Sequence, residues 1–366
     1  MTLSWGATAL IIKTLPAWGK ILGPDYQEED DIYYKAIDLI SKIIFIWNTI
    51  YLLITIPTLF SCLKNLQKIL NHPLQHNFLA LIPMSLGVWA TSWGVLFKME
   101  NTAYFCYWIA YFLSYFTVIY LNYKNISNSK MKNFPIVQSA LIFPSLPNIV
   151  AAAAGATLIP VMSDGNRKIV LLVSSYVSLG TGFCLSLCVI SLYFVRLIQQ
   201  GFPHLQIANS VWVIVGPIGH SANTIMQLAR HVYQINLDGF FTQSSNSNNN
   251  YNQFWKIFSE NIIASSFACG LLLWGFALFW IFAAFLTVLH HKNNITFNLS
   301  FWSIIFPMAT FTFSTYQLAI LTDFWLFHVI SIFLAAAIFL TAIIVHVFTL
   351  CEVFFNSNKF WASFSK

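Results

Sequence analysis

The chain has 366 residues, of which 58% are hydrophobic and only 8% are charged. Soluble domains carry about 25% charged residues, so this composition excludes a soluble globular protein. It predicts a protein embedded in the lipid bilayer. The net charge of +6 is spread over many short loops without a dense basic patch, so we expect no nucleic acid partner.

A helix that crosses a bilayer needs roughly 20 apolar residues, and ten stretches of the chain approach or exceed that length. We therefore predict an all-α membrane protein with ten transmembrane helices. The predicted spans are Thr2–Leu22, Leu39–Cys62, Phe78–Phe97, Thr102–Tyr123, Ile136–Val161, Ile169–Val195, Ile207–Leu228, Ile262–Val288, Phe297–Leu321 and Trp325–Leu350. The first span is the weakest because Lys13 lies inside it, and we expect it to be retained rather than cleaved as a signal peptide.

The short connections between these spans predict a single polytopic membrane domain over residues 1–366. The longest predicted loops are 22–37, which holds an acidic run, and 233–260, which holds a polar tract, and residues 351–366 form a C-terminal tail. The six cysteines lie in or beside the helices without metal-type spacing. We therefore predict neither a metal site nor a cofactor.

Proline interrupts every second predicted helix. The first, third, fifth, seventh and ninth segments carry Pro16, Pro83, Pro144, Pro147, Pro160, Pro217 and Pro307. Among the even segments only the second has a proline, Pro57. Proline removes a helix hydrogen bond, and in lipid the freed backbone groups must face protein or water. We therefore predict five kinked inner helices around a central pore, with five straighter helices outside, which suits a transport protein.

The seventh segment is predicted to weaken near the middle of the membrane and to line the pore. Glycine and proline cost about 1 and 3 kcal/mol relative to alanine inside a helix, and here they are followed at once by polar residues. The predicted pore or substrate lining of this segment is Gly216, Pro217, Gly219, His220, Ser221 and Asn223. The alternative is a kink whose polar groups bond to neighbouring helices.

The third, fifth and ninth segments share one order, in which proline is followed by small or hydroxyl residues. Their predicted lining positions are Pro83, Ser85, Pro147, Asn148, Pro307, Thr310 and Thr312. An aromatic ring, that of Phe306, directly precedes Pro307. Such a ring can close a narrow pore by dewetting it, so we predict that Phe306 is the gate. The alternative is an ordinary packing residue, since the chain has 35 phenylalanines.

The charge inventory predicts an anion as the substrate. The third, fifth, seventh and ninth segments contain no Asp or Glu, whereas cation pathways usually place carboxylates there. Hydroxyl and amide groups beside broken-helix termini suit anions. Few fixed positive charges line the predicted path, so anion binding should be weak.

His220 is the only titratable side chain near the middle of these four segments. An imidazole changes its charge near neutral pH, so we predict a proton-coupling or pH-gating role for His220. The alternative is a neutral ring that donates a hydrogen bond to a neighbouring helix.

Two motifs resemble those of the tellurite-resistance/dicarboxylate transporter family. Residues 212–221, Trp-Val-Ile-Val-Gly-Pro-Ile-Gly-His-Ser, are similar to its Gly-Pro-x-Gly-Gln signature. Residues 301–310, Phe-Trp-Ser-Ile-Ile-Phe-Pro-Met-Ala-Thr, are similar to its Phe-Trp-x-x-x-Phe-Pro-Met-Gly-Thr segment. That family includes fungal malate permeases, yeast sulfite pumps, bacterial tellurite-resistance proteins and plant slow anion channels. The resemblance extends over the whole chain through its spans and alternating prolines.

The resemblance implies five helical hairpins, a pore formed by helices 1, 3, 5, 7 and 9, and a homotrimer. It also implies that a phenylalanine of the ninth helix, here Phe306, occludes the pore. The Lys and Arg residues of the predicted loops divide equally between the two sides, so they do not decide the orientation. We expect a plasma-membrane protein with both termini in the cytoplasm, as in the family.

The sequence departs from the family pattern at three places. His220 stands where many members have glutamine, and Ala309 replaces a glycine after Phe-Pro-Met. Residues 5–8, Trp-Gly-Ala-Thr, are only a remnant of the Met-Gly-Thr-Gly motif of the first helix. The first departure leaves the substrate and the pH behaviour open.

We therefore predict transmembrane transport of small anions or organic acids, such as malate, sulfite or an inorganic anion, by a channel or a proton-coupled carrier. A membrane enzyme would need His, Asp, Glu or Cys clustered on facing helices, and the transmembrane acids are too few and scattered. A non-transporting membrane sensor or scaffold is the remaining alternative. Flux in purified vesicles separates it from a transporter.

Overall fold

The structure is a computed structural model that describes residues 1–14, 32–64, 66–72, 74–127, 138–237, 249–292 and 297–355. These residues form helices and turns, without a strand. Their α-helices are α1 (Thr2–Thr14), α3 (Ile32–Lys64), α4 (Leu66–Asn71), α5 (Leu81–Phe97), α6 (Glu100–Ser127), α7 (Leu146–Leu158), α8 (Gly165–Gln200), α9 (Val215–Leu237), α10 (Asn249–His290), α11 (Trp302–Thr322) and α12 (Trp325–Phe355). Their 3₁₀ segments are η2 (Gln75–Ala80), η5 (Ser139–Ser145), η6 (Ile159–Val161), η7 (Leu205–Ile214) and η9 (Leu299–Phe301).

Eight helical stretches of the described chain are long and apolar enough to cross a membrane. They correspond to the predicted second to sixth and eighth to tenth spans, so the chain is an all-α, multi-pass membrane protein. The first span is described only as α1, up to Thr14. The seventh is formed by η7 and the more polar α9, which is not among the eight. The count of ten spans therefore stays a prediction.

Burial separates inner spans from outer spans. In the third, fifth and ninth spans, 56%, 89% and 67% of the most apolar window is buried. In the second, fourth, sixth, eighth and tenth, the buried share is only 22% to 33%. Since lipid rather than protein would cover the exposed apolar faces, the third, fifth and ninth segments lie inside and the even-numbered segments lie outside.

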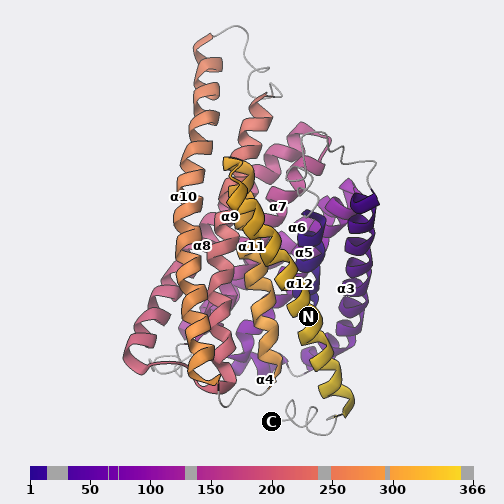
Figure 1. Ribbon diagram of the computed structural model, residues 1–366, viewed down its shortest axis with the longest axis vertical. Coiled ribbons are helices and arrows are strands. Elements are labelled where there is room, and N and C mark those ends of the chain that lie inside the picture. Colours follow the sequence, from indigo (N-terminus) through magenta and orange to yellow (C-terminus); the bar gives the residue numbers. More distant parts are fainter. Residues whose placement is uncertain are drawn as a thin grey trace.

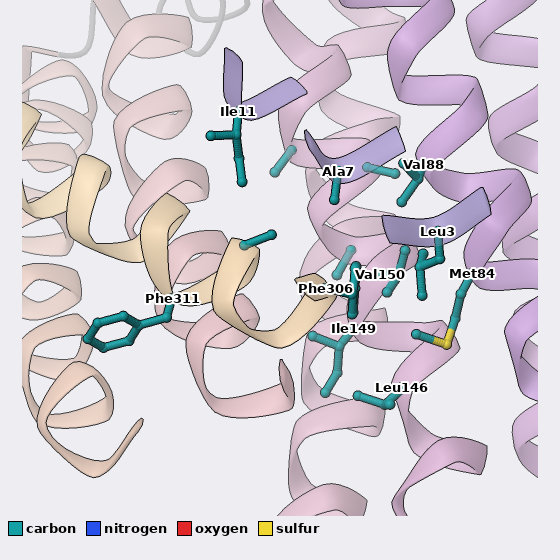
Figure 2. Packing of buried hydrophobic residues seen from close by; sticks show 14 of the residues in the cluster. Leu3, Ala7, Ile11, Met84, Val88, Leu146, Ile149, Val150, Phe306 and Phe311 are labelled. Atoms are coloured by element: carbon teal, nitrogen blue, oxygen red, sulfur yellow. The ribbon is translucent and has the colours of Figure 1, made fainter. Parts of the chain in front are cut away.

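The inner helices form a closed ring. α1 packs on α5, α5 on α7, α7 on α9 and α9 on α11, and α11 returns to α1. Each inner helix also packs on the helix that follows it, α3, α6, α8, α10 or α12, and Figure 1 shows α3 and α10 at opposite edges of the bundle. Figure 2 shows side chains of four inner helices in one apolar cluster, among them Ala7, Val88, Val150 and Phe306.

The prolines of the inner helices mark changes of helix type rather than simple kinks. α5, α7, α9 and α11 each follow a 3₁₀ segment, respectively η2, η5, η7 and η9. Pro83, Pro147 and Pro217 lie in the first turn of their α-helices, directly after the 3₁₀ segments, where the hydrogen-bond pattern of the helix changes. Only Pro307 lies well inside its α-helix. Pro16 lies outside the described residues.

Helices at the expected loops extend further than hydropathy predicts. α3 already begins at Ile32, within the expected 22–37 loop, and α9 continues to Leu237, within the expected 233–260 loop. α12 continues to Phe355, within the expected tail 351–366. A helix satisfies its own backbone in water as well as in lipid, so it can continue beyond its apolar part. The acidic run of the first loop lies outside the described residues.

Lys13, the charged residue that weakens the first span, has a partner in the next helix. Its ammonium group donates to the carboxylate of Asp38 in α3. The same carboxylate pairs with Lys42 one turn further along α3, at an N–O distance of 2.6 Å. Pairing with an opposite charge lowers the free energy needed to place a charged side chain in a membrane. The ion pairs of Asp38 with Lys13 and Lys42 therefore allow α1 to carry a lysine inside the bundle.

Candidate functional site

A cavity of about 330 Å³ lies between the inner helices α1, α5, α7, α9 and α11. Its apolar walls include Ala7 and Leu10 of α1, Val88 of α5 and Phe306 of α11. Its polar walls consist of Thr91, Thr157, His220, Asn223, Gln227, Arg230, His231, Gln234, Thr310, Tyr316 and Gln317. Among the described residues, no Asp or Glu lines this cavity. The lining therefore offers hydroxyl, amide and cationic groups without a fixed negative charge.

α9 supplies the main polar stripe of the cavity. Its lining residues His220, Asn223, Gln227, Arg230 and Gln234 follow one another at steps of three or four. Residues at that spacing lie on one face of a helix. Since an α-helix rises 1.5 Å per residue, the stripe is about 21 Å long, which is a large part of a hydrocarbon core of about 30 Å.

Arg230 brings a permanent positive charge into the cavity. Its Nη1 donates to Oε1 of Gln317 in α11 at 3.0 Å. No carboxylate of the described chain pairs with it. The sequence prediction placed Arg230 in a loop and expected few positive charges on the path, and the structure differs because α9 continues as a helix beyond Leu228. The three-and-four spacing of polar residues over 220–234 was the signal that could have found it.

Phe306 and His220 meet at the cavity wall. Phe306 is 7% exposed, and its ring lies edge to face with the imidazole of His220, at a centroid distance of 5.8 Å. Nδ1 of His220 is buried and has no hydrogen-bond partner within the described chain. Figure 2 shows Phe306 in the same apolar cluster as Ile149 and Val150 of α7. The aromatic ring predicted as the gate and the predicted proton-coupling residue are therefore in direct contact.

Gly219 of the seventh segment allows α9 and α11 to approach closely. A Cβ on Gly219 would lie 3.0 Å from the backbone nitrogen of Phe311. Oγ1 of Thr310 lies 3.2 Å from the carbonyl oxygen of Gly216 and 2.7 Å from that of Pro307. These contacts join the two helices that carry the two motifs of the sequence.

The cavity gathers four of the predicted site residues, namely Phe306, His220, Asn223 and Thr310. The others lie outside its lining and comprise Pro83, Ser85, Pro147, Asn148, Gly216, Pro217, Gly219, Ser221, Pro307 and Thr312. The glycines and prolines among them lie at the backbone contacts and helix starts described above.

The polar members of this second group bond within the bundle or are buried. Nδ2 of Asn148 donates to Oγ1 of Thr181 in the outer helix α8 at 3.0 Å. The hydroxyl of Ser85 lies 3.1 Å from that of Thr2, and Thr312 donates to the carbonyl of Met308 in its own helix. Ser221 is buried. The pattern of proline followed by small polar residues therefore indicates an inner helix. It does not indicate which of these side chains faces the cavity.

Comparison with known proteins gives one family and several transporters as relatives. Residues 1–350 match the family described as voltage-dependent anion channel (SLAC1). The chain is 25% identical over 347 residues to the sulfite efflux pump SSU1 of Arthroderma benhamiae, which covers 87% of this chain and 80% of that protein. It is 24% identical, with the same coverage, to the sulfite efflux pump SSU1 of Trichophyton rubrum. It is 22% identical over 290 residues to an uncharacterized transporter of Methanocaldococcus jannaschii, covering 78% of this chain and 77% of that protein.

Proposed function

The chain belongs to the voltage-dependent anion channel (SLAC1) family, and we propose that anions cross the membrane through the cavity enclosed by α1, α5, α7, α9 and α11. The family and the named relatives are channels and transporters, so the chain is a membrane transporter of anions. The resemblance to tellurite-resistance and dicarboxylate transporters is thereby confirmed.

The observation that carries the proposed route is the charge balance of the cavity. Arg230 supplies a cation, while the amides and hydroxyls around it supply further hydrogen-bond donors. No acidic residue of the described chain faces the same space. An anion is therefore attracted into the cavity and a cation is repelled from it.

Phe306 is the proposed gate of this route. Its buried ring extends the apolar part of the wall, and a bulky apolar ring in a narrow passage keeps water and ions out. His220, in edge-to-face contact with that ring, is the proposed site at which protons regulate or drive transport. Protonation would place a charge beside the ring and change its packing.

Sulfite is the proposed substrate to test first, with malate and inorganic anions as the other candidates. The relatives that match 87% of this chain at 24% to 25% identity carry the name sulfite efflux pump. By the same family resemblance, we propose a homotrimer in the plasma membrane with both termini in the cytoplasm. Cross-linking in membranes tests the trimer.

Anion flux in proteoliposomes tests the proposed route and its substrate. Uptake of chloride, nitrate, sulfite and malate is compared with and without a pH gradient. Flux that follows the electrical potential alone identifies a channel, and flux that requires the proton gradient identifies a carrier. No flux of any anion would contradict the proposal and would favour a membrane sensor or scaffold.

A further inference from the structure

We propose that Arg230 and Gln317 form an oxyanion-binding site at one end of the cavity, which favours anions with paired oxygens, such as sulfite, over chloride. This inference rests on the proposed route and specifies which side chains select the anion. It starts from an unusual feature of the cavity: a permanent charge inside a membrane protein whose partner is a neutral amide.

The hydrogen bond between the two residues orients the guanidinium group. Nη1 of Arg230 donates to Oε1 of Gln317 at 3.0 Å, and both side chains line the cavity. A guanidinium group has five N–H donors in a planar fork, and this bond uses one of them. The remaining donors match two oxygens of one anion, whereas a spherical chloride ion cannot use the fork in that way.

The charge of Arg230 lacks a counterion in the described chain. Its nearest partner is an amide, and the described cavity lining contains no carboxylate. A charge at membrane depth is costly and is normally paired or placed at a functional position. An anion that enters the cavity would supply the missing counterion, so the site is complete only with a substrate bound.

The position of Arg230 along α9 places it between the polar edge of the bundle and the gate. Nδ2 of Asn236, six residues further along α9, donates to Oγ of Ser259 at 3.1 Å. Ser259 precedes Glu260, after which the long apolar stretch of α10 begins. Arg230 is therefore about 9 Å deeper than that edge and about 15 Å from the level of His220. An anion that enters from the C-terminal end of α9 would therefore meet Arg230 before it meets Phe306.

If Arg230 and Gln317 had a purely structural role, substitutions in the pair would have the opposite effect on transport. In that case the hydrogen bond would serve to join α9 to α11, and a stronger bond between the two residues would do no harm to transport. Gln317→Glu separates the two roles, because it keeps the shape of the side chain and gives Arg230 a carboxylate partner. The internal ion pair would strengthen the contact between the helices while it competes with the substrate for the guanidinium group.

The experiment measures sulfite and chloride uptake by the full-length protein in proteoliposomes. For Gln317→Glu we expect the sulfite concentration at half-maximal flux to rise about tenfold, in line with the loss of a charged hydrogen bond. For Arg230→Lys, which keeps the charge and loses the fork, we expect chloride flux to remain and the sulfite-to-chloride ratio to fall about threefold or more. Gln200→Glu, at the exposed end of α8, adds the same charge outside the cavity and should change neither quantity.

Unchanged sulfite half-saturation in Gln317→Glu, together with an unchanged flux ratio in Arg230→Lys, would overturn the oxyanion site. The proposed route would survive that result if the wild type carries flux and Phe306→Ala raises it. A wild type without flux of any anion would overturn both proposals. Thermal unfolding of each variant in detergent shows whether a change in flux comes from lost protein rather than from a lost site.

Discussion

The imidazole of His220 meets the phenyl ring of Phe306 edge to face, with an interplanar angle of 78°. His220 belongs to α9 and Phe306 to α11, so this contact joins the two inner helices that carry the two sequence motifs. A ring that closes a pore can therefore respond to the state of its neighbour. This contact places the proposed gate against the side chain that we propose as the proton-coupling residue.

Replacing Phe306 by alanine should raise anion flux. The change removes a buried ring from the cavity wall, and we expect about a tenfold increase, which corresponds to roughly 1.4 kcal/mol removed from the barrier. Proteoliposome flux per reconstituted molecule measures it. Phe311→Ala is the matched control, because Phe311 is buried in the same helix and stacks on Trp274 instead of lining the cavity. Equal flux in wild type and Phe306→Ala would assign the gate to another residue.

Replacing His220 by glutamine should flatten the pH dependence of transport. Glutamine keeps a polar group beside Phe306 but cannot take up a proton as an imidazole can. The flux is measured at a series of pH values with a fixed anion gradient. His328→Gln serves as the control, because His328 is a histidine of α12 outside the cavity lining, 3.6 Å from Asp323. A profile that keeps its shape in His220→Gln would leave His220 a packing residue.

Replacing Gly219 by alanine should loosen the contact between α9 and α11. The new methyl group would lie 3.0 Å from the backbone of Phe311, so the helices must separate, at a cost of about 1–3 kcal/mol. Gly216→Ala is the control in the same helix, since its methyl group would lie 3.8 Å from Pro307. Thermal unfolding in detergent should show a lower midpoint for Gly219→Ala alone. Equal midpoints for the two variants would refute the close approach.

Replacing Thr310 by valine should remove a hydrogen bond between helices without changing the volume of the side chain. The hydroxyl lies 3.2 Å from the carbonyl oxygen of Gly216 in α9, and interhelical bonds of this kind contribute about 0.5–1.5 kcal/mol. Thr312→Val is the control, because that hydroxyl bonds only to Met308 in its own helix. Denaturant titrations compare the two variants. A larger loss for Thr312→Val would show that the bond to α9 contributes little.

The sequence was sufficient to predict which helices lie inside. Alternating prolines identified the odd-numbered segments because proline leaves backbone groups that lipid cannot satisfy. It was not sufficient to predict the form of the break, because Pro147 and Pro217 stand at the junction of 3₁₀ and α-helix rather than at mid-helix. The position of the junction between the 3₁₀ segment and the α-helix depends on how the 3₁₀ segment packs, and a proline alone does not determine it.

The sequence singled out some residues of the cavity lining and missed others. Phe306, His220 and Thr310 line the cavity, and each stands next to a motif that breaks a helix; their roles as gate, proton-coupling residue and pore lining stay predictions. Arg230 was missed because hydropathy ends the span at Leu228, while the helix and its polar face continue. Asn148 was assigned to the pore although it bonds to α8, since a sequence read one helix at a time does not show which neighbour a polar face meets.

The ring of inner helices closes within one chain, because α11 returns to α1. No second copy is needed to complete the wall of the cavity. Whatever the stoichiometry of the assembly, each subunit would contain a complete copy of the proposed route, and neighbouring subunits would share an interface rather than a passage. The anion flux should then scale with the number of active subunits. An inactive subunit would leave transport by its neighbours unchanged.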